Sequence, residues 1–308
     1  MLARPGPPPA GAGFFAEAKW DGARGIARVH GGGVDLISRP GNNFCSRFPD
    51  LTESLAQSLG GHSAILDGEV IARDGHGRPS FARLQRRLRV QRPSRTLLSG
   101  VPASFCLFDV LHLDGQDLTS RPYAQRRAIL EDLALSGGPI VVPPVWQDLP
   151  GAVLLAAAAE LDLEGAVFKR SDSTYHAGRR SRSWIKCPIR KRAIVAVIGW
   201  TRGRAEPVGA LAIGAHDSRG NLVYCGTVTS GLGQANRRAL HQLLCQHETS
   251  RSPLADHRDH ALGSIRWVKP RLIGAIDYRE YTGRRFRHPA WKGLVTASLD
   301  AAVLPAIQ

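Results

Sequence analysis

The sequence lacks a long apolar run. No stretch approaches the roughly 20 apolar residues of a membrane-spanning helix, so none is expected. Cysteine is scarce, with five residues in 308, and no C-x-x-C spacing marks a zinc ribbon or a redox site. Scattered thiols are typical of a reducing compartment. The start of the chain has no secretory signal, so we expect a cytoplasmic protein. The cysteines are Cys45, Cys106, Cys187, Cys225 and Cys245.

Lysine is rare in a strongly basic chain. Lys and Arg total 41 against 26 Asp and Glu, a net charge of +15 that favours nucleic acid as the partner. A compositional bias toward arginine is the competing explanation, because only six of these 41 residues are lysines. A guanidinium neither loses its proton nor acts as a nucleophile, so each lysine is a candidate for a required amine. They are Lys19, Lys169, Lys186, Lys191, Lys269 and Lys292.

The length predicts two domains, at about 100–200 residues each. Residues 1–13 are rich in Pro, Gly and Ala, and we expect a flexible leader there. Residues 14–190 mix strand and helix patterns and predict an α+β domain. Residues 191–308 show short strands, a hairpin turn at 218–221 and one helix at 236–247, a pattern typical of a small β-barrel such as an OB-fold.

Within the first domain, a glycine cluster at 31–33 predicts a tight turn between two strands of a hairpin. Residues 63–73 are expected to form strand, turn and strand, and 103–113 form a buried strand. We expect Thr119 or Ser120 to cap a long helix that ends at 135, with Pro122 in its first turn. Further helices are expected at 49–59, 80–90 and 152–161, and further strands at 140–145 and 165–170.

An ordered set of short motifs carries the chemistry. Lys19-Trp20-Asp21-Gly22 is weak alone, because three fixed residues in four occur by accident. It is preceded by Glu17 and followed by Arg24. The further motifs, in chain order, are Ser38-Arg39-Pro40-Gly41, Leu66-Asp67-Gly68-Glu69, Phe105 to Asp109, Glu164 to Lys169, and Arg180 with Ser183-Trp184-Ile185-Lys186.

In order and spacing these motifs resemble those of ATP-dependent DNA ligases, most closely the small bacterial ligases of the LigC and LigD ligase-domain type. The resemblance extends from residue 14 to about 294 and includes three of the six lysines. It implies an α+β nucleotidyltransferase (adenylation) domain followed by an OB-fold. It also implies that ATP is the nucleotide, that AMP becomes attached to Lys19, and that Mg²⁺ or Mn²⁺ is required.

The resemblance also implies a role for each matching residue. Lys19 would be the nucleophile that attacks the α-phosphate of ATP, and an amine does this only after losing a proton. The other roles are Glu17 at adenine, Arg24 and Arg39 around ribose and phosphate, Glu69 at the ribose or the metal, Phe108 stacked on the base, Glu164 at the metal, and Lys169, Arg180 and Lys186 around the α-phosphate.

Two motifs depart from the family pattern. The family's K-x-K motif is represented by Lys186 alone, because Cys187 and Pro188 follow it. The final R-x-D-K motif, which orients pyrophosphate, is replaced by Val-Thr-Ala-Ser at 295–298. Arg285, Arg287 and Lys292 are candidate substitutes. Trp291, in the same region, is expected to be a hydrophobic anchor.

The resemblance implies nicked or broken duplex DNA as substrate, a monomer, and an end-binding protein and a repair polymerase as partners. An RNA ligase or a GTP-using capping enzyme would share the lysine chemistry, and a non-catalytic nucleic-acid-binding protein would share the fold. An NAD-dependent ligase is disfavoured, because 18 residues precede Lys19 and the tetracysteine zinc site is missing. Arginines between 83 and 95 are expected either to track phosphates or to form a solvated helix face.

Overall fold

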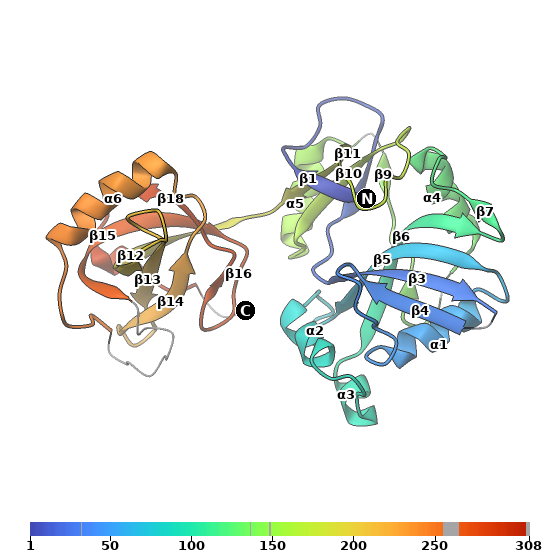
Figure 1. The fold of residues 1–308 in the computed structure, drawn as a ribbon, viewed down its shortest axis with the longest axis horizontal. Helices are drawn as coiled ribbons and strands as arrows, with labels where there is room; N and C mark the ends of the chain where they lie inside the picture. Colours follow the sequence, from blue (N-terminus) through green and yellow to red (C-terminus); the bar gives the residue numbers. More distant parts are fainter. Residues whose placement is uncertain (32, 136, 148, 255–264, 306–308) are drawn as a thin grey trace. The chain divides into compact units, whose positions relative to one another are not determined.

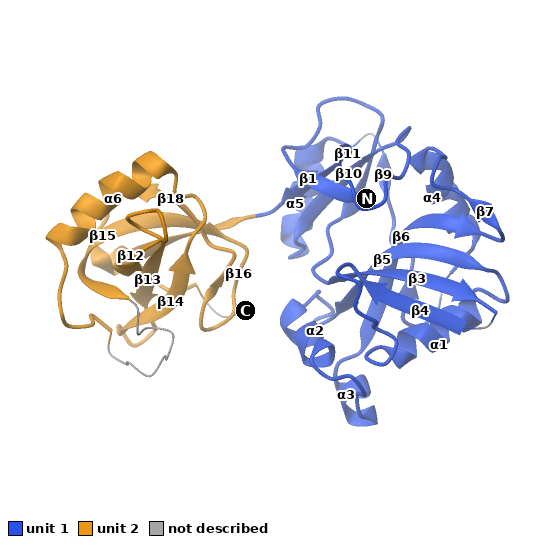
Figure 2. Cartoon of the chain, viewed as in Figure 1, with its two compact units in different colours: residues 1–189 blue, residues 190–308 orange. Residues whose placement is uncertain are grey.

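The computed structural model describes residues 1–31, 33–135, 137–147, 149–254 and 265–305. The chain divides into two compact units, Met1–Ile189 and Arg190–Gln308 (Figure 2), and the sequence places the boundary near the same residue, 190. Within the described residues no helix is long and apolar enough to cross a membrane.

The larger sheet of the first unit has strand order β4-β3-β5-β6-β7, with β8 beside β6 (Figure 1). Helix α1 buries Leu51 and Leu55 at helical spacing, and α4 also packs on this sheet. The strands are β3(Ala23–His30), β4(Gly33–Ser38), β5(Ala64–Ala72), β6(Ala103–Leu113), β7(Gln116–Asp117) and β8(Ile140–Val141). The helices are α1(Pro49–Ser58), α2(Phe81–Leu88), α3(Arg95–Gly100) and α4(Tyr123–Asp132).

A second sheet in the same unit has strand order β1-β11-β10-β2-β9. Helix α5 packs on β10 and β2 through a small apolar cluster that includes Leu154 and Phe168. Met1, which precedes β1, and Trp184 of β11 join Leu111 and Tyr175 in a cluster of their own. The elements are β1(Leu2–Pro5), β2(Phe14–Ala18), β9(Trp146–Gln147), α5(Gly151–Glu160), β10(Gly165–Arg170) and β11(Arg180–Pro188).

Three local expectations differ from the structure. The start of the predicted flexible leader, Leu2–Pro5, is strand β1, which pairs in parallel with β11. Residues 64–72 form one continuous strand without a turn, because both edges of β5 pair with β3 and β6. Helix α4 begins at Tyr123 rather than at 119, and its N-cap residue is Pro122, which forms no side-chain cap hydrogen bond.

The second unit is an OB-fold. Its sheet order is β14-β13-β12-β15-β18, and a parallel bridge between Ser230 and Ala290 brings the end of β14 to the start of β18. Helix α6 lies between the third and fourth strands of this barrel in chain order. The α+β class and the OB-fold are therefore confirmed. The elements are β12(Lys191–Thr201), β13(Ala210–His216), β14(Leu222–Val228), α6(Gln234–Gln246), β15(Arg266–Tyr278), β16(Glu280–Tyr281), β17(Phe286–Arg287), β18(Ala290–Leu294) and η2(Leu299–Ala301).

Candidate active site

A pocket in the first unit is lined by residues of both its sheets and has an empty volume of about 720 Å³, its open mouth included. Small-molecule sites commonly occupy about 300–1,000 Å³. Strands β1, β2, β10 and β11 contribute one set of residues and β3, β5 and β6 the other. The lining residues predicted from the sequence are Glu17, Lys19, Arg24, Arg39, Glu69, Phe108, Lys169, Arg180 and Lys186.

Lys19 follows directly after β2, and its amine meets the last predicted site residue, Glu164. The Nζ atom lies 2.5 Å from Glu164 Oε2, and the two side chains are 20% and 11% exposed. The Lys19 amide donates to the carbonyl oxygen of Gly165 at 2.8 Å, which ties the nucleophile's backbone to the start of β10. Gly165 has φ +137°, and a Cβ there would collide with the Cys187 carbonyl oxygen. The glycine after Glu164 is therefore required by backbone geometry.

Lys169 is buried beneath the pocket and pairs with Glu17. Its Nζ lies 2.7 Å from Glu17 Oε1, and it donates to the Phe108 carbonyl oxygen at 3.3 Å. Aromatic rings surround the ammonium, and the ring centroid of Phe108 lies 4.2 Å away. Burial lowers the pKa of Lys169, and the Glu17 carboxylate opposes that change. The structure thus places Lys169 against the predicted adenine contact, whereas the resemblance implies a place at the α-phosphate.

Arg24 is held in place by a carboxylate that sequence reasoning did not single out. Asp67 is fully buried in β5 and accepts from Arg24 Nε at 2.8 Å and from Nη2 at 2.5 Å. The Tyr175 hydroxyl donates to the same carboxylate at 2.9 Å. Arg24 Nη1 also donates to the Met1 carbonyl oxygen at 2.5 Å. This fork-like pairing fixes the guanidinium plane at the pocket wall.

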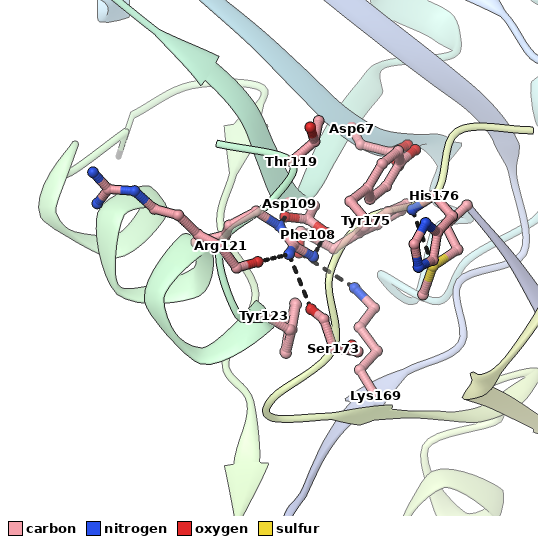
Figure 3. A network of polar contacts seen from close by, with 12 residues as sticks. Asp67, Phe108, Asp109, Thr119, Arg121, Tyr123, Lys169, Ser173, Tyr175 and His176 are labelled. Atoms are coloured by element: carbon pink, nitrogen blue, oxygen red, sulfur yellow. Dashed lines mark hydrogen bonds and ion pairs between the residues drawn. The ribbon is translucent and has the colours of Figure 1, made fainter. Parts of the chain in front are cut away.

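A second buried ion pair supports the same region (Figure 3). Arg126 of α4 donates to both oxygens of Asp109 at 2.8 and 2.9 Å, and both side chains are fully buried. The guanidinium also donates to the carbonyl oxygens of Arg121 and Ser173. Asp109 follows Phe108 in β6, so this network fixes the backbone that carries the predicted base-stacking ring.

Glu69 and Glu164 are the two predicted metal ligands, and their setting fits a divalent cation. No hydrogen bond or ion pair to the Glu69 carboxylate occurs among the described residues, and burial raises its pKa to about 8, opposed by the nearby Lys19 and Arg24. The charge of Glu164 adds to this rise. Mg²⁺ is usually held by one or two carboxylates together with substrate phosphates. A partly buried acid without a hydrogen-bonded partner, beside a second acid, suits that arrangement.

Three cations line the pocket at its more exposed side. Arg39 follows β4 and is exposed, and Arg180 donates to the Ala3 carbonyl oxygen. Burial lowers the pKa of Lys186, and the charges of Lys19, Arg180 and Arg39 lower it further. Three nearby cations that repel one another are suited to a ligand carrying several negative charges.

Several residues that support or line the pocket were not among the predicted site residues. Asp67 and Tyr175 hold Arg24, Tyr123 donates to Glu17, and Leu2 and Ala3 of β1 form part of the wall. Asp67 lies within the Leu66-Asp67-Gly68-Glu69 motif, which was a usable signal. The tyrosines and β1 carry none, because only long-range pairing brings them to the pocket.

We expect the Tyr123 phenol to limit stability in alkali. Its burial, strengthened by the adjacent Glu17 carboxylate, raises its pKa well above the usual value of about 10. Above pH 10 the unfolded chain therefore loses this proton first, and each further pH unit lowers the free energy of unfolding by about 1.4 kcal/mol. Denaturant unfolding of wild type and Tyr123→Phe measures this. The difference in free energy of unfolding between the two proteins should be constant from pH 7 to 9 and change between pH 10 and 11. A difference that stays constant over the whole range would contradict a raised pKa of Tyr123.

The candidate substitutes for the last motif lie in the second unit. Arg287 pairs with Glu280 at 2.7 Å, and Lys292 lies 3.4 Å from Asp277. Arg285 stacks over the Tyr224 ring, 5.3 Å from its centroid. Trp291 is 4% exposed and packs against Gly274, where any Cβ would collide with the indole. Trp291 is thus placed as a core anchor.

Comparisons with known proteins agree with this geometry. Residues 9–187 match the model of the ATP dependent DNA ligase domain, and residues 204–296 match the ATP dependent DNA ligase C terminal region. The multifunctional non-homologous end joining protein LigD of Mycolicibacterium smegmatis is 36% identical over 283 residues, which are 90% of this chain and 35% of that protein. The chain therefore spans about a third of the length of the LigD proteins that it matches.

A shorter relative and a solved structure match over most of both chains. DNA ligase C2 of Mycolicibacterium smegmatis is 30% identical over 309 residues, covering 90% of this chain and 84% of that protein. The structure of mycobacterial DNA ligase D complexed with ATP and MES is 32% identical with a TM-score of 0.56, covering 99% of this chain and 97% of that one.

Proposed function

The chain belongs to the family of ATP-dependent DNA ligases, and from this premise we propose that it seals breaks in duplex DNA through an adenylate on Lys19. One observation carries the proposal. A lysine amine lies 2.5 Å from a carboxylate in a pocket that also presents acidic side chains, arginines and an aromatic ring. These are the groups that a nucleotidyl transfer to an amine requires.

In the first step the Lys19 amine would attack the α-phosphorus of ATP. The new N–P bond forms as the bridging α–β P–O bond breaks, and pyrophosphate leaves. The amine must lose a proton, and Glu164 Oε2 is the acceptor at hydrogen-bonding distance. Arg39, Arg180 and Lys186 would offset the negative charge that develops on the phosphates. The product is a lysyl-AMP phosphoramidate.

Other residues would hold the nucleotide during this step. Phe108 offers its ring at the pocket wall to the base, and Glu17 lies at the buried end, where Lys169 and Tyr123 fix its orientation. Arg24, oriented by Asp67, would contact the ribose or a phosphate. Holding the α-phosphate beside Lys19 supplies the proximity that makes the transfer fast.

Glu69 and Glu164 would hold Mg²⁺ or Mn²⁺. The ion would supply positive charge at the phosphate oxygens and help hold the phosphate chain in place. Glu164 therefore has two proposed duties, as a metal ligand and as the partner of the Lys19 amine.

Two transfers to DNA complete the reaction. An oxygen of a DNA 5′-phosphate would attack the phosphorus of lysyl-AMP, which breaks the N–P bond and returns the amine of Lys19. The 3′-hydroxyl of the adjoining strand would then attack the 5′-phosphate and displace AMP. The net result is one phosphodiester bond for one ATP.

The nucleotide-transfer step is tested by intact mass of the purified chain after incubation with ATP and Mg²⁺, GTP and Mg²⁺, or NAD and Mg²⁺. We expect a gain of one AMP with ATP alone. A gain of GMP would favour a capping enzyme. A protein that is folded, carries no AMP as purified and gains none would favour a nucleic-acid-binding protein without catalysis. Nicked duplexes with DNA or RNA ends, offered to the adenylated protein, then separate a DNA ligase from an RNA ligase.

We propose that the physiological substrate is a double-strand break. The relatives that are named non-homologous end joining proteins support this proposal. An end-binding protein and a repair polymerase would then act beside this chain in the bacterial cytoplasm. All five cysteines are free, as in a reducing compartment. Adding a purified end-binding protein should stimulate joining of linear DNA more than sealing of nicks.

A further inference from the structure

The segment from Gly75 to Phe108 contains no acidic residue and seven arginines. It runs from the end of β5, through α2 and α3, to the middle of β6. Helices α2 and α3 lie at the same end of the first unit (Figure 1). A long acid-free stretch within a folded unit concentrates positive charge on one part of its surface.

Two of these arginines stabilise the fold. Arg87 is fully buried and donates to both oxygens of Asp50 at 2.9 and 2.6 Å. Arg83 donates to the Gly100 carbonyl oxygen at 2.5 Å, which links α2 to the end of α3. Neither guanidinium is therefore available to a ligand without breaking an existing contact.

The other five arginines are exposed, and four of these lie on α2 or beyond it. None of the four has a hydrogen bond or an ion pair from its side chain to another described residue. Two lie in the outward part of α2 and just after it, opposite the buried Leu84 and Arg87. One helical turn separates these two, a rise of about 4.5 Å. The third lies in the connection to α3 and the fourth is the first residue of α3. These four residues form the arginine face: Arg86, Arg89, Arg92 and Arg95.

We propose that the arginine face binds the phosphate backbone of the duplex that flanks the break. This inference rests on the proposed ligase function. Along one strand of duplex DNA the charges repeat about every 3.4 Å of the axis, so the roughly 12 Å length of α2 spans about three to four phosphates of a strand. Four guanidiniums without internal partners match that density, and each can bind a phosphate through two N–H groups.

An acidic protein fits the arginine face less well. Protein interfaces centre on buried apolar or aromatic anchors. Between the four arginines, Leu88 packs against the core, and Val90, 37% exposed, is the large apolar residue on the surface. Phosphate binding needs no such anchor. The face therefore suits contact with DNA that is independent of base sequence.

The arginine face is separate from the nucleotide pocket, because none of its four residues lines that pocket. Neutralising the face should therefore weaken DNA binding and leave the transfer of AMP from ATP to Lys19 unchanged. This separation distinguishes the present inference from the proposed function. If wild type forms no adenylate, the proposed function fails, whatever the arginines do.

The test compares wild type with R86Q/R89Q/R92Q/R95Q by fluorescence anisotropy on a nicked duplex and on the same duplex without a nick, between about 50 and 200 mM salt. We expect at least tenfold weaker binding of both duplexes at the lower salt concentration. The slope of log K against log salt should become less negative by about 3 to 4, since each phosphate contact contributes about 0.9. Adenylation measured by intact mass should equal that of wild type.

The matched control is R86K/R89K/R92K/R95K, which keeps the four charges and should keep most of the affinity and the salt slope. Arg89→Gln alone should make the slope of log K against log salt less negative by about 1. This single variant replaces the fourfold variant in the test if the fourfold variant does not fold. Unchanged affinity and slope in a variant that still forms the adenylate would overturn the proposal and leave an acidic protein as the occupant. A loss confined to the nicked duplex would also overturn it, because the contact would then be with the nick.

Discussion

Lys19→Ala is expected to abolish the covalent adenylate entirely while the protein stays folded and keeps its salt-sensitive DNA binding. The amine is the only protein group proposed to bond to phosphorus, so no neighbouring residue replaces it. Removing the side chain leaves Glu164, which is 11% exposed, without the ammonium at 2.5 Å, so some loss of stability should accompany the loss of the adenylate. Intact mass after incubation with ATP and Mg²⁺, beside a DNA-binding titration, measures both outcomes.

Lys19→Arg is the matched control for charge. The guanidinium keeps a positive charge beside Glu164 but does not act as a nucleophile, so this variant should also form no adenylate. Adenylate in either variant would move the nucleophile to another residue. Loss of adenylate and DNA binding together would instead indicate a misfolded protein, which circular dichroism and thermal unfolding would show.

The fold and the site differ in how much of them local sequence specifies. The hairpin of β3 and β4, the strand β6 and helix α1 follow from alternation, a glycine turn and helical spacing, which operate over a few residues. The ordered motifs likewise contain most of the predicted site residues that line the pocket. Strands β2, β3, β5, β6, β10 and β11 carry these residues to one cavity. Resemblance to a family, rather than composition, connected those motifs.

The remaining features depend on contacts that are distant in sequence. β1 pairs with β11 about 180 residues away, and nothing in its Leu-Ala-Arg-Pro sequence predicts a strand. Asp67 is fully buried only because Arg24 and Tyr175 both bind it. The pairing of Lys169 with Glu17 could not be predicted either, because a lysine in a strand does not show which side of the sheet it faces without the neighbouring strands.

Lys169→Met is expected to be the most destabilising substitution in the pocket and also to block adenylation. Lys169 is 1% exposed, and its removal leaves the Glu17 carboxylate buried without its cation. Breaking a buried pair from one side costs about 3–5 kcal/mol in free energy of unfolding. Denaturant unfolding measures the loss, and intact mass with ATP measures adenylation.

Lys186→Met provides the matched control, since it removes a lysine that lines the same pocket but forms no hydrogen bond or ion pair among the described residues. Its free energy of unfolding should stay within about 0.5 kcal/mol of wild type while adenylation slows. Glu17→Gln combined with Lys169→Met removes both charges and should recover most of the stability lost by Lys169→Met. If the double variant also recovers adenylation, neither charge contributes to binding the nucleotide. If Lys169→Met unfolds like Lys186→Met, the Lys169 ammonium is not paired with Glu17, and its place is at the phosphates after all.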